Sequence, residues 1–385
     1  MAAQDRAGSA VRTNRRLHVL HVSAPTGGGV ATVATGYLRD QVERGWNVTV
    51  ACPSIGDLGY AAREAGATVR WWRASGHGLG LLGAAARLRR IVAEAAPDVV
   101  HLHSGTAGLA GRLVVRDRIP TVFQPHAWSF LDEGSSVQGA SLRWERYAAR
   151  WTTELLCVSG TERQLGESLG IHAPATVLPN GIDLSGFRPG GARDRVAARK
   201  ALGLEDVPTA LCVGALTVQK GQQDLLADWP EVRAQVPDAQ LLLVGDGPDR
   251  RALERLAEGV PGVIFAGART DIPTWFTAAD VVVIPSRWEG MALVPLEAMA
   301  CARSLVATDV NGVVDSVPIE AGAIVGLDDG AGLVAAVVRR LQDPALAEQE
   351  GWAGRSHVET HHDVTDSSQE LARVYLRLVG ARRAR

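Results

Sequence analysis

The sequence lacks several features that mark particular protein classes. Its 40 Lys and Arg residues against 42 Asp and Glu give a net charge of −2, which argues against a nucleic-acid-binding protein. The four cysteines lie far apart, without metal-ligand spacing or the density of a disulfide scaffold, which predicts reduced thiols and a cytoplasmic location. No apolar run approaches the ~20 residues of a membrane span, and the run near the N-terminus is too short and polar for a signal peptide.

Short runs of Val, Ile and Leu alternate with longer stretches of helical period, a rhythm typical of a parallel sheet wrapped by helices. Strands are predicted at 17–23, 46–52, 68–72, 99–103, 120–124, 155–159, 209–214, 240–245, 263–266, 281–285 and 304–308. A Pro/Gly-rich stretch near residue 190 divides them into two series. The predicted fold is α/β, with two Rossmann-like, doubly wound domains (1–189 and 190–365) facing each other across a cleft, and a C-terminal helix within 366–385 that packs back toward the first.

The densest group of candidate site residues follows the strand predicted at 281–285. Glu289 lies in the loop after it, and a helix is predicted to begin near Met291. Free amides at a helix N-terminus favour an anion such as a phosphate. These amides belong to Gly290, Met291, Ala292 and Leu293. Glu297 stands eight positions after Glu289, and each carboxylate can accept hydrogen bonds from a vicinal diol, one on a sugar ring and one on a ribose. The alternative is a helix whose acidic residues only favour its dipole.

Lysine is nearly absent, since only Lys200 and Lys220 occur among the 40 basic residues. Lys220 follows the predicted strand that ends at Gly214 and precedes Gly221 and a helix. An ammonium on a flexible stem is a good partner for a diphosphate, which makes Lys220 a candidate ligand for one. A surface lysine ahead of a helix is the simpler alternative.

A glycine-rich loop, residues 27–29, follows the first predicted strand. It fails as a dinucleotide fingerprint because Thr32 stands where a glycine is required and the second strand ends without an acidic residue, so a nicotinamide enzyme is disfavoured. The amides of Gly28 and Gly29 can still face a phosphate or a sugar across the cleft.

Together these motifs resemble the retaining glycosyltransferases of family 4, which have the two-domain GT-B fold. The resemblance covers almost the whole chain. Its other motifs are Asp98-Val-Val-His-Leu-His103, Gln124-Pro-His126-Ala-Trp-Ser129, Val158-Ser159, Val177-Leu-Pro-Asn180-Gly181-Ile-Asp183 and Leu243-Val-Gly245-Asp-Gly247-Pro248.

The resemblance implies a hexosyltransferase that uses a nucleotide-diphosphate sugar, with uridine as the default base. The second domain would bind this donor, with Lys220 on the diphosphate, Glu297 on the ribose and the amides of residues 290–293 on phosphate and sugar. Glu289 would contact hydroxyls of the transferred sugar, and His126 matches the family's active-site histidine beside that sugar. The first domain would bind an acceptor hydroxyl of a small molecule, a saccharide or a lipid carrier, and the sugar would be transferred with retention.

One position departs from the family pattern, since Ala215 stands where a diphosphate-binding Arg is usual. We expect Arg269 or Arg287, both in loops after second-domain strands, to supply the missing charge. No Asp-x-Asp motif is present, so no metal and no cofactor beyond the donor is expected. A non-catalytic sugar-nucleotide-binding paralogue and a GT-B-like sugar-nucleotide epimerase remain as alternatives.

The acceptor site is the part of the sequence with the weakest signal. Candidate acceptor residues are His103 at a strand end, and Trp128 and Asp132 after the next strand. The chain ends in the basic segment 381–385, which we interpret as a solvated helix end, with contact to an anionic membrane as a weaker option. The sequence does not indicate an oligomeric state.

Overall fold

The computed structural model describes residues 16–73, 78–131 and 138–384 of the chain. Two parallel sheets form its framework, one of seven strands in the order β3-β2-β1-β4-β5-β6-β7 and one of six in the order β10-β9-β8-β11-β12-β13. The first sheet contains β1 His18–Ser23, β2 Asn47–Cys52, β3 Thr68–Trp71, β4 Val99–His103, β5 Thr121–Gln124, β6 Glu154–Cys157 and β7 Ala175–Val177. The second contains β8 Thr209–Val213, β9 Gln240–Val244, β10 Val263–Gly267, β11 Val281–Ile284, β12 Ser304–Thr308 and β13 Gly322–Val325.

Helices cover both faces of each sheet, as parallel strands require for their crossovers. Those of the N-terminal unit, the first sheet with its helices, are α1 Gly28–Glu43, α2 Leu58–Glu64, α3 Gly78–Ala95, α4 Ser104–Val115, α5 Gln138–Ala148 and α6 Gly160–Ser168. Those of the C-terminal unit, the second sheet with its helices, are α7 Ala192–Leu202, α8 Gln222–Gln235, α9 Arg250–Leu256, α10 Ile272–Ala278, α11 Leu293–Ala300, α12 Val313–Ser316, α13 Gly330–Gln342 and α14 Pro344–His361. The last helix is α15 Val364–Arg383, and short 3₁₀ turns lie at Ala149–Trp151, Val218–Lys220 and Ile319–Ala321.

All eleven strands predicted from the sequence are present, and two more were not predicted. The predicted strands read as uninterrupted Val, Ile and Leu runs because most of their residues are buried on both faces, as in β4 and β9. The two missed strands are β7, with the sequence Ala-Thr-Val, and β13, with Gly-Ala-Ile-Val. Each is an edge strand of its sheet and is half-buried over most of its length, so it carries little of the apolar signal.

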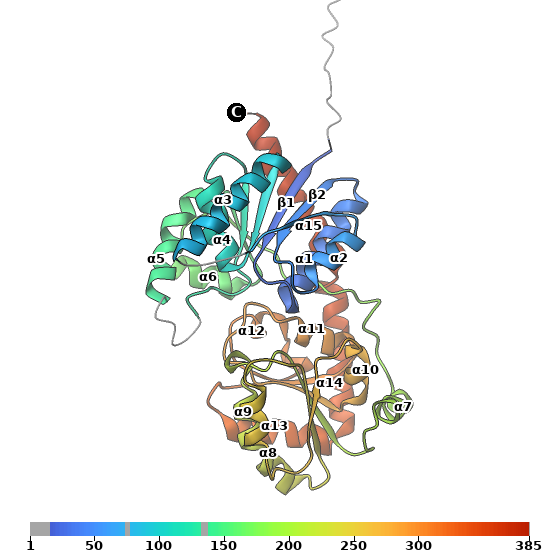
Figure 1. Cartoon of the computed structure of the whole chain (residues 1–385). Coiled ribbons are helices and arrows are strands. Elements are labelled where there is room, and N and C mark those ends of the chain that lie inside the picture. Colours follow the sequence, from blue (N-terminus) through green and yellow to red (C-terminus); the bar gives the residue numbers. More distant parts are fainter. Residues whose placement is uncertain (1–15, 74–77, 132–137, 385) are drawn as a thin grey trace, which may run out of the picture.

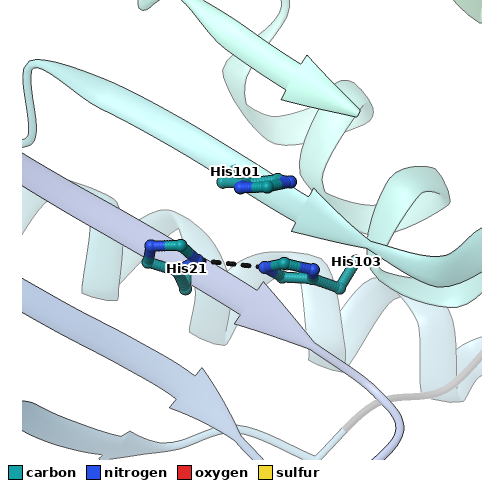
Figure 2. A group of neighbouring side chains, drawn as sticks. All are labelled: His21, His101 and His103. Atoms are coloured by element: carbon teal, nitrogen blue, oxygen red, sulfur yellow. Dashed lines mark hydrogen bonds between the residues drawn. The ribbon is translucent and has the colours of Figure 1, made fainter. Parts of the chain in front are cut away.

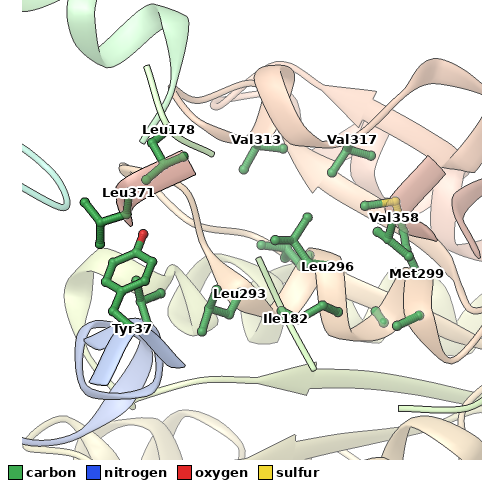
Figure 3. Close-up of a cluster of buried hydrophobic side chains, with 14 of the residues drawn as sticks. Tyr37, Leu178, Ile182, Leu293, Leu296, Met299, Val313, Val317, Val358 and Leu371 are labelled. Atoms are coloured by element: carbon green, nitrogen blue, oxygen red, sulfur yellow. The ribbon is translucent and has the colours of Figure 1, made fainter. Parts of the chain in front are cut away.

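The two units lie one above the other, with α11 and α12 at the top of the C-terminal unit where it meets the N-terminal unit (Figure 1). A buried hydrophobic cluster joins them across this junction (Figure 3). Tyr37 and Ile182 enter it from the N-terminal side, and Leu293 and Leu296 enter it from α11. The cleft between the two sheets is therefore closed on one side by a shared apolar core, which fixes how the carboxyl ends of the strands face each other.

The last helix returns from the C-terminal unit to the N-terminal unit, as the sequence predicted (Figure 1). Asp363 caps its start by accepting a hydrogen bond from the Thr365 amide at 2.7 Å, and α15 then packs on α1 and β4. The basic end is engaged with the N-terminal unit, since the Arg382 guanidinium donates to the Asp117 carbonyl at 3.0 Å and Arg383 lies 3.5 Å from the Asp98 carboxylate.

The four cysteines are free and buried. No helix within the described residues is both long enough and apolar enough to cross a membrane.

The packing of α15 predicts a large difference between two leucines on this helix. Leu371 is 1% exposed in the shared core and Leu376 is 55% exposed. Leu371→Ala should lower the free energy of unfolding by about 2–5 kcal/mol because it leaves a cavity, whereas Leu376→Ala should change it by less than about 0.5 kcal/mol. Urea denaturation of both variants measures this, and equal effects would contradict the packing described here.

Candidate active site

The predicted lysine lies at the carboxyl end of the second sheet because two backbone segments approach closely there. A 3₁₀ turn after β8 ends at Lys220, and Gly221 follows with a φ of 64°. A Cβ on Gly221 would lie 1.9 Å from the carbonyl oxygen of Pro285 at the end of β11, so only glycine fits. This approach brings the Lys220 side chain from the β8 loop to the β11 loop.

Lys220 forms an ion pair with Glu289 at this point. Its Nζ donates to Glu289 Oε1, and the same oxygen accepts a hydrogen bond from Ser286 Oγ at 2.8 Å. The Glu289 side chain is 6% exposed and that of Lys220 is 22% exposed. The sequence placed the two residues in separate motifs, and the structure brings them into one polar group at the floor of the cleft.

Helix α11 begins two residues later than predicted, at Leu293, with Ala292 as its N-cap. Among the described residues, none accepts a hydrogen bond from the backbone N–H groups of residues 290–293. The Asn180 side chain holds this turn from the N-terminal unit, since its Nδ2 donates to the Met291 carbonyl at 2.8 Å. The start of α11 thus presents unpaired donors next to Lys220, an arrangement suited to an anion.

The N-terminal unit touches the same turn through its backbone. A Cβ on Gly290 would lie 2.5 Å from the His126 carbonyl oxygen and 2.8 Å from the Ala127 nitrogen, so a side chain at Gly290 would push the two units apart. His126 and Ala127 themselves have positive φ values, 61° and 134°, which non-glycine residues rarely adopt. Gly29 lies opposite as well, since a Cβ there would be 3.6 Å from Leu293 Cγ.

His126 continues into a row of buried histidines, the histidine chain, which consists of His21, His103 and His126. His126 Nε2 lies 3.0 Å from His103 Nδ1, and His103 Nε2 lies 3.0 Å from His21 Nδ1. The second of these contacts is the dashed line of Figure 2, where His101 lies beside them with its ring stacked on His103 at 4.0 Å between centroids. The sequence pointed to the last two members but not to His21, which is hidden in the apolar run of β1.

Burial keeps these imidazoles uncharged at neutral pH. It lowers the pKa of His126 to about 3 and that of His21 to about 4, and it places the pKa values of His101 and His103 well below the usual value. His126 is only half-buried, whereas the other three are inaccessible to solvent. His126 is the member of this group beside the start of α11, and its neutral ring can donate one hydrogen bond and accept one.

The second predicted carboxylate, Glu297, lines a cavity of about 480 Å³ between the two units. The cavity runs from Gly28 along α1 to the crossing segment 181–183 and lacks Lys220 and Glu289. Glu297 thus lines a space that does not include the Lys220–Glu289 pair, and its predicted contact with a ribose stays a prediction. Burial alone raises the pKa of Glu297 to about 7.

Two of the three residues predicted to bind the acceptor, Trp128 and His103, have different surroundings from those expected. Trp128 is 2% exposed, and its indole N–H donates to the Glu162 carbonyl at 2.9 Å, so its ring is part of the N-terminal core. His103 is buried and meets the cleft only through His126. Asp132 lies outside the described residues. A residue that the sequence did not indicate is Glu162, whose carboxylate accepts from the Val158 amide at 2.8 Å and also bonds the Ala127 amide beside His126.

Both arginines expected to replace the missing cation at Ala215 already have carboxylate partners. Arg269 bonds Asp271 at 3.0 and 3.1 Å beyond the edge strand β10, with its guanidinium over the Trp275 ring. Arg287 bonds Asp224 at 2.8 and 3.1 Å. The backbone of Arg287 does reach the Lys220 turn, since its amide donates to the Gln219 carbonyl at 2.8 Å.

The structure has the architecture of a GT-B glycosyltransferase. Two Rossmann-like units are joined by a shared core and a returning C-terminal helix, and a lysine and free helix amides lie between them. Comparison with family models agrees. Residues 27–185 match the model described as "Glycosyltransferase Family 4", and residues 207–343 match "Glycosyl transferases group 1". The chain belongs to glycosyltransferase family 4, so the family, fold and enzyme class predicted from the sequence are confirmed.

Relatives with curated names include several sugar transferases. The lipopolysaccharide core biosynthesis mannosyltransferase LpsB of Rhizobium meliloti is 30% identical over 63% of this chain and 70% of that protein. A GDP-mannose-dependent phosphatidylinositol monomannoside mannosyltransferase of Mycobacterium tuberculosis is 31% identical over 71% and 74%. A related monoacylated-substrate enzyme of Corynebacterium glutamicum is 36% identical, but the match spans only 52% of this chain and 55% of that enzyme.

Solved structures share the fold over almost the whole chain. The sucrose-phosphate synthase of Thermosynechococcus elongatus superposes with a TM-score of 0.82 at 23% identity, covering 95% of this chain and 100% of that one. Anabaena HepE in complex with UDP and glucose also gives 0.82, at 20% identity, covering 93% and 99%.

The environment of Glu297 predicts how stability depends on pH. Its pKa of about 7 lies above the usual 4.5, so the folded protein holds the proton of Glu297 more tightly than the unfolded chain does. The stability that comes from this bound proton is lost as the pH rises through 7. Relative to Glu297→Gln, the wild-type protein should therefore lose stability between about pH 5 and about pH 8. Chemical denaturation of both proteins across this range measures the difference. Parallel stability curves would show that the carboxylate is not desolvated.

Proposed function

We propose that the protein transfers a glycosyl unit from a nucleotide-diphosphate sugar to an acceptor hydroxyl, with retention at the anomeric carbon and without a metal ion. The observation that supports this most is the joint position of Lys220 and the free amides of residues 290–293 beside His126. A cation and a helix N-terminus in one place suit a diphosphate, and a neutral imidazole next to them suits a sugar.

The step breaks the bond between the anomeric carbon and the diphosphate oxygen and forms a bond to the acceptor oxygen. The bonding electrons leave with the diphosphate, whose charge grows in the transition state and is stabilised by Lys220 and by the amides at the start of α11. The proton of the acceptor hydroxyl passes to the leaving phosphate on the same face of the sugar. Glu289 and His126 position the sugar by hydrogen bonds to its hydroxyls, and Glu297 binds the ribose.

In this mechanism Lys220 exchanges its partner Glu289 for the diphosphate when the donor binds. Glu289 Oε1 already accepts from Ser286, so Glu289 keeps one hydrogen bond when Lys220 turns toward the diphosphate. The sugar hydroxyls then take the place of the ammonium on the carboxylate. Because Arg269 and Arg287 are held by their own carboxylates, Lys220 is the cation assigned to the diphosphate.

A saccharide or a lipid-linked saccharide is the acceptor class that the relatives favour. Their names describe mannosyl transfer to phosphatidylinositol mannoside and to lipopolysaccharide core, galactosyl transfer to a diphosphoundecaprenol-linked sugar, and glycogen synthesis. Peripheral contact with a membrane surface would accompany a lipid-linked acceptor. The cytoplasmic location suggested by the isolated cysteines stays a prediction, as do the assignments of acceptor to the N-terminal unit and donor to the C-terminal unit.

Lys220 and Lys200 provide a matched pair of variants, because they are the only lysines and Lys200 is exposed on α7. Lys220→Met should lower kcat by about a hundredfold or more, since it removes charge stabilisation of the leaving diphosphate, while Lys200→Met should leave it unchanged. The assay follows sugar transfer with candidate saccharide and lipid-linked acceptors. Equal rates for the two variants would remove Lys220 from the mechanism.

A donor screen tests the proposed substrate class. UDP-glucose, UDP-galactose and GDP-mannose are added to the protein, and the donor that fits should raise stability by about 2–4 kcal/mol at 100 to 1,000 times its Kd, which is read as a rise in Tm. UDP-sugars are the expected ligands, and Glu297→Ala should reduce the rise. Binding without turnover of any acceptor would favour the non-catalytic paralogue, and conversion of the donor without acceptor would favour the epimerase.

A further inference from the structure

A buried hydrogen-bonded path leads away from His126 into the N-terminal core. It comprises the histidine chain and, at its far end, Gln41 of α1, whose Oε1 lies 2.9 Å from His21 Nε2. Gln41 is 2% exposed, and His21 and His103 are 1% and 0% exposed. Strands β1 and β4, the segment after β5 and helix α1 therefore supply one continuous row of polar groups. All of them except His126 are buried from solvent.

The pairing of nitrogen atoms along this row permits only one arrangement of protons. Each neutral imidazole carries one N–H, and the Oε1 atom of Gln41 can only accept. His21 must then carry its proton on Nε2, which leaves its Nδ1 to accept from Nε2–H of His103. In turn, Nδ1 of His103 accepts from Nε2–H of His126, so the proton of His126 also lies on Nε2 and its Nδ1 holds the lone pair.

The Gln41 amide presents its oxygen to His21, since Gln41 Oε1 lies 2.9 Å from His21 Nε2. Tyr375, from α15, bonds His101 Nδ1 at 2.6 Å. The amide oxygen of Gln41 therefore faces His21, and α15 borders the histidines through Tyr375.

We propose that Gln41 is a positioning residue for catalysis: through His21 and His103 it fixes His126 as the Nε2–H tautomer and leaves His126 Nδ1 as a hydrogen-bond acceptor for the bound sugar. This inference rests on the proposed function of His126. Along the histidine chain, the position of the proton on one ring determines its position on the next. No charge moves, because all of its members remain neutral. An imidazole with both tautomers populated would accept the sugar hydroxyl in only part of the molecules, and the orienting group of a catalytic histidine acts in the same way.

A metal ion is the competing occupant of this region. His21, His101 and His103 each offer a nitrogen within 4.8 Å of the others. In the structure, however, Nδ1 of His21 and Nε2 of His103 are bonded to each other, and the rings of His101 and His103 are stacked face to face. A metal could bind only if that hydrogen bond were broken, so the two arrangements exclude each other.

The test is NMR of the full-length enzyme with ¹⁵N-labelled histidine, which reports the protonated nitrogen of each imidazole. Wild type should show His21, His103 and His126 as Nε2–H tautomers. Gln41→Leu removes the terminal acceptor and should give a mixture of tautomers at His126, while Gln41→Glu, which still accepts, should restore the single form. Tyr37→Phe is the matched control on the same face of α1, and it should leave the three tautomers unchanged.

Kinetics of the same variants connect the tautomer to the reaction. Gln41→Leu should lower kcat by about tenfold without changing donor affinity, and Gln41→Glu should recover most of the rate. His126 found as the Nδ1–H tautomer, an unchanged His126 spectrum in Gln41→Leu, or one equivalent of tightly bound zinc would each overturn the proposal. Unchanged transfer by His126→Ala would instead overturn the role of His126 in the proposed function, which separates the two failures.

Discussion

The geometry of the site depends on a contact between two stretches of backbone, Gly290 in the C-terminal unit against His126 and Ala127 in the N-terminal unit. No side chain fits between them, since a Cβ on Gly290 would lie 2.5 Å from the His126 carbonyl oxygen. The contact places the free amides at the start of α11 next to a histidine from the other sheet. The shared core of α11, α1 and α15 holds the two surfaces in this register. A polar site between two units is thus fixed by apolar packing behind it and by one glycine at its front.

Much of the fold could be predicted because the strands of a parallel sheet are buried on both faces and therefore have continuous apolar sequences. Val99–His103 and Gln240–Val244 are examples in which every residue is buried. The short edge strand Ala175–Val177 gave no such signal, because its side chains are only half-buried and the stretch is three residues long. The existence of α15 was predictable from its amphipathic pattern. Its partners, including the buried hydroxyl of Tyr375, depend on tertiary packing that no local pattern contains.

In the site, too, the residues could be predicted from local sequence, whereas their contacts with residues far away in the chain could not. Lys220 and Glu297 were identified as candidates because one of only two lysines and a spaced pair of carboxylates are visible along the chain. Their environments were not visible: the ion pair between Lys220 and Glu289 joins residues 69 positions apart, and the bond between His21 and His103 joins residues 82 apart. Trp128 was misplaced because an aromatic residue after a strand can line a cleft or fill a core, and only the position of Glu162 decides between these.

The central claim is that the diphosphate of an activated sugar binds at the start of α11. A crystal structure of the protein with UDP or GDP, whichever gives the larger rise in Tm, tests it most directly. We predict phosphate oxygens within hydrogen-bonding distance of the amides of residues 290–293 and of Lys220 Nζ, with the ribose at Glu297. A nucleotide bound elsewhere, with Lys220 still paired to Glu289 and the amides facing no phosphate, would contradict the account.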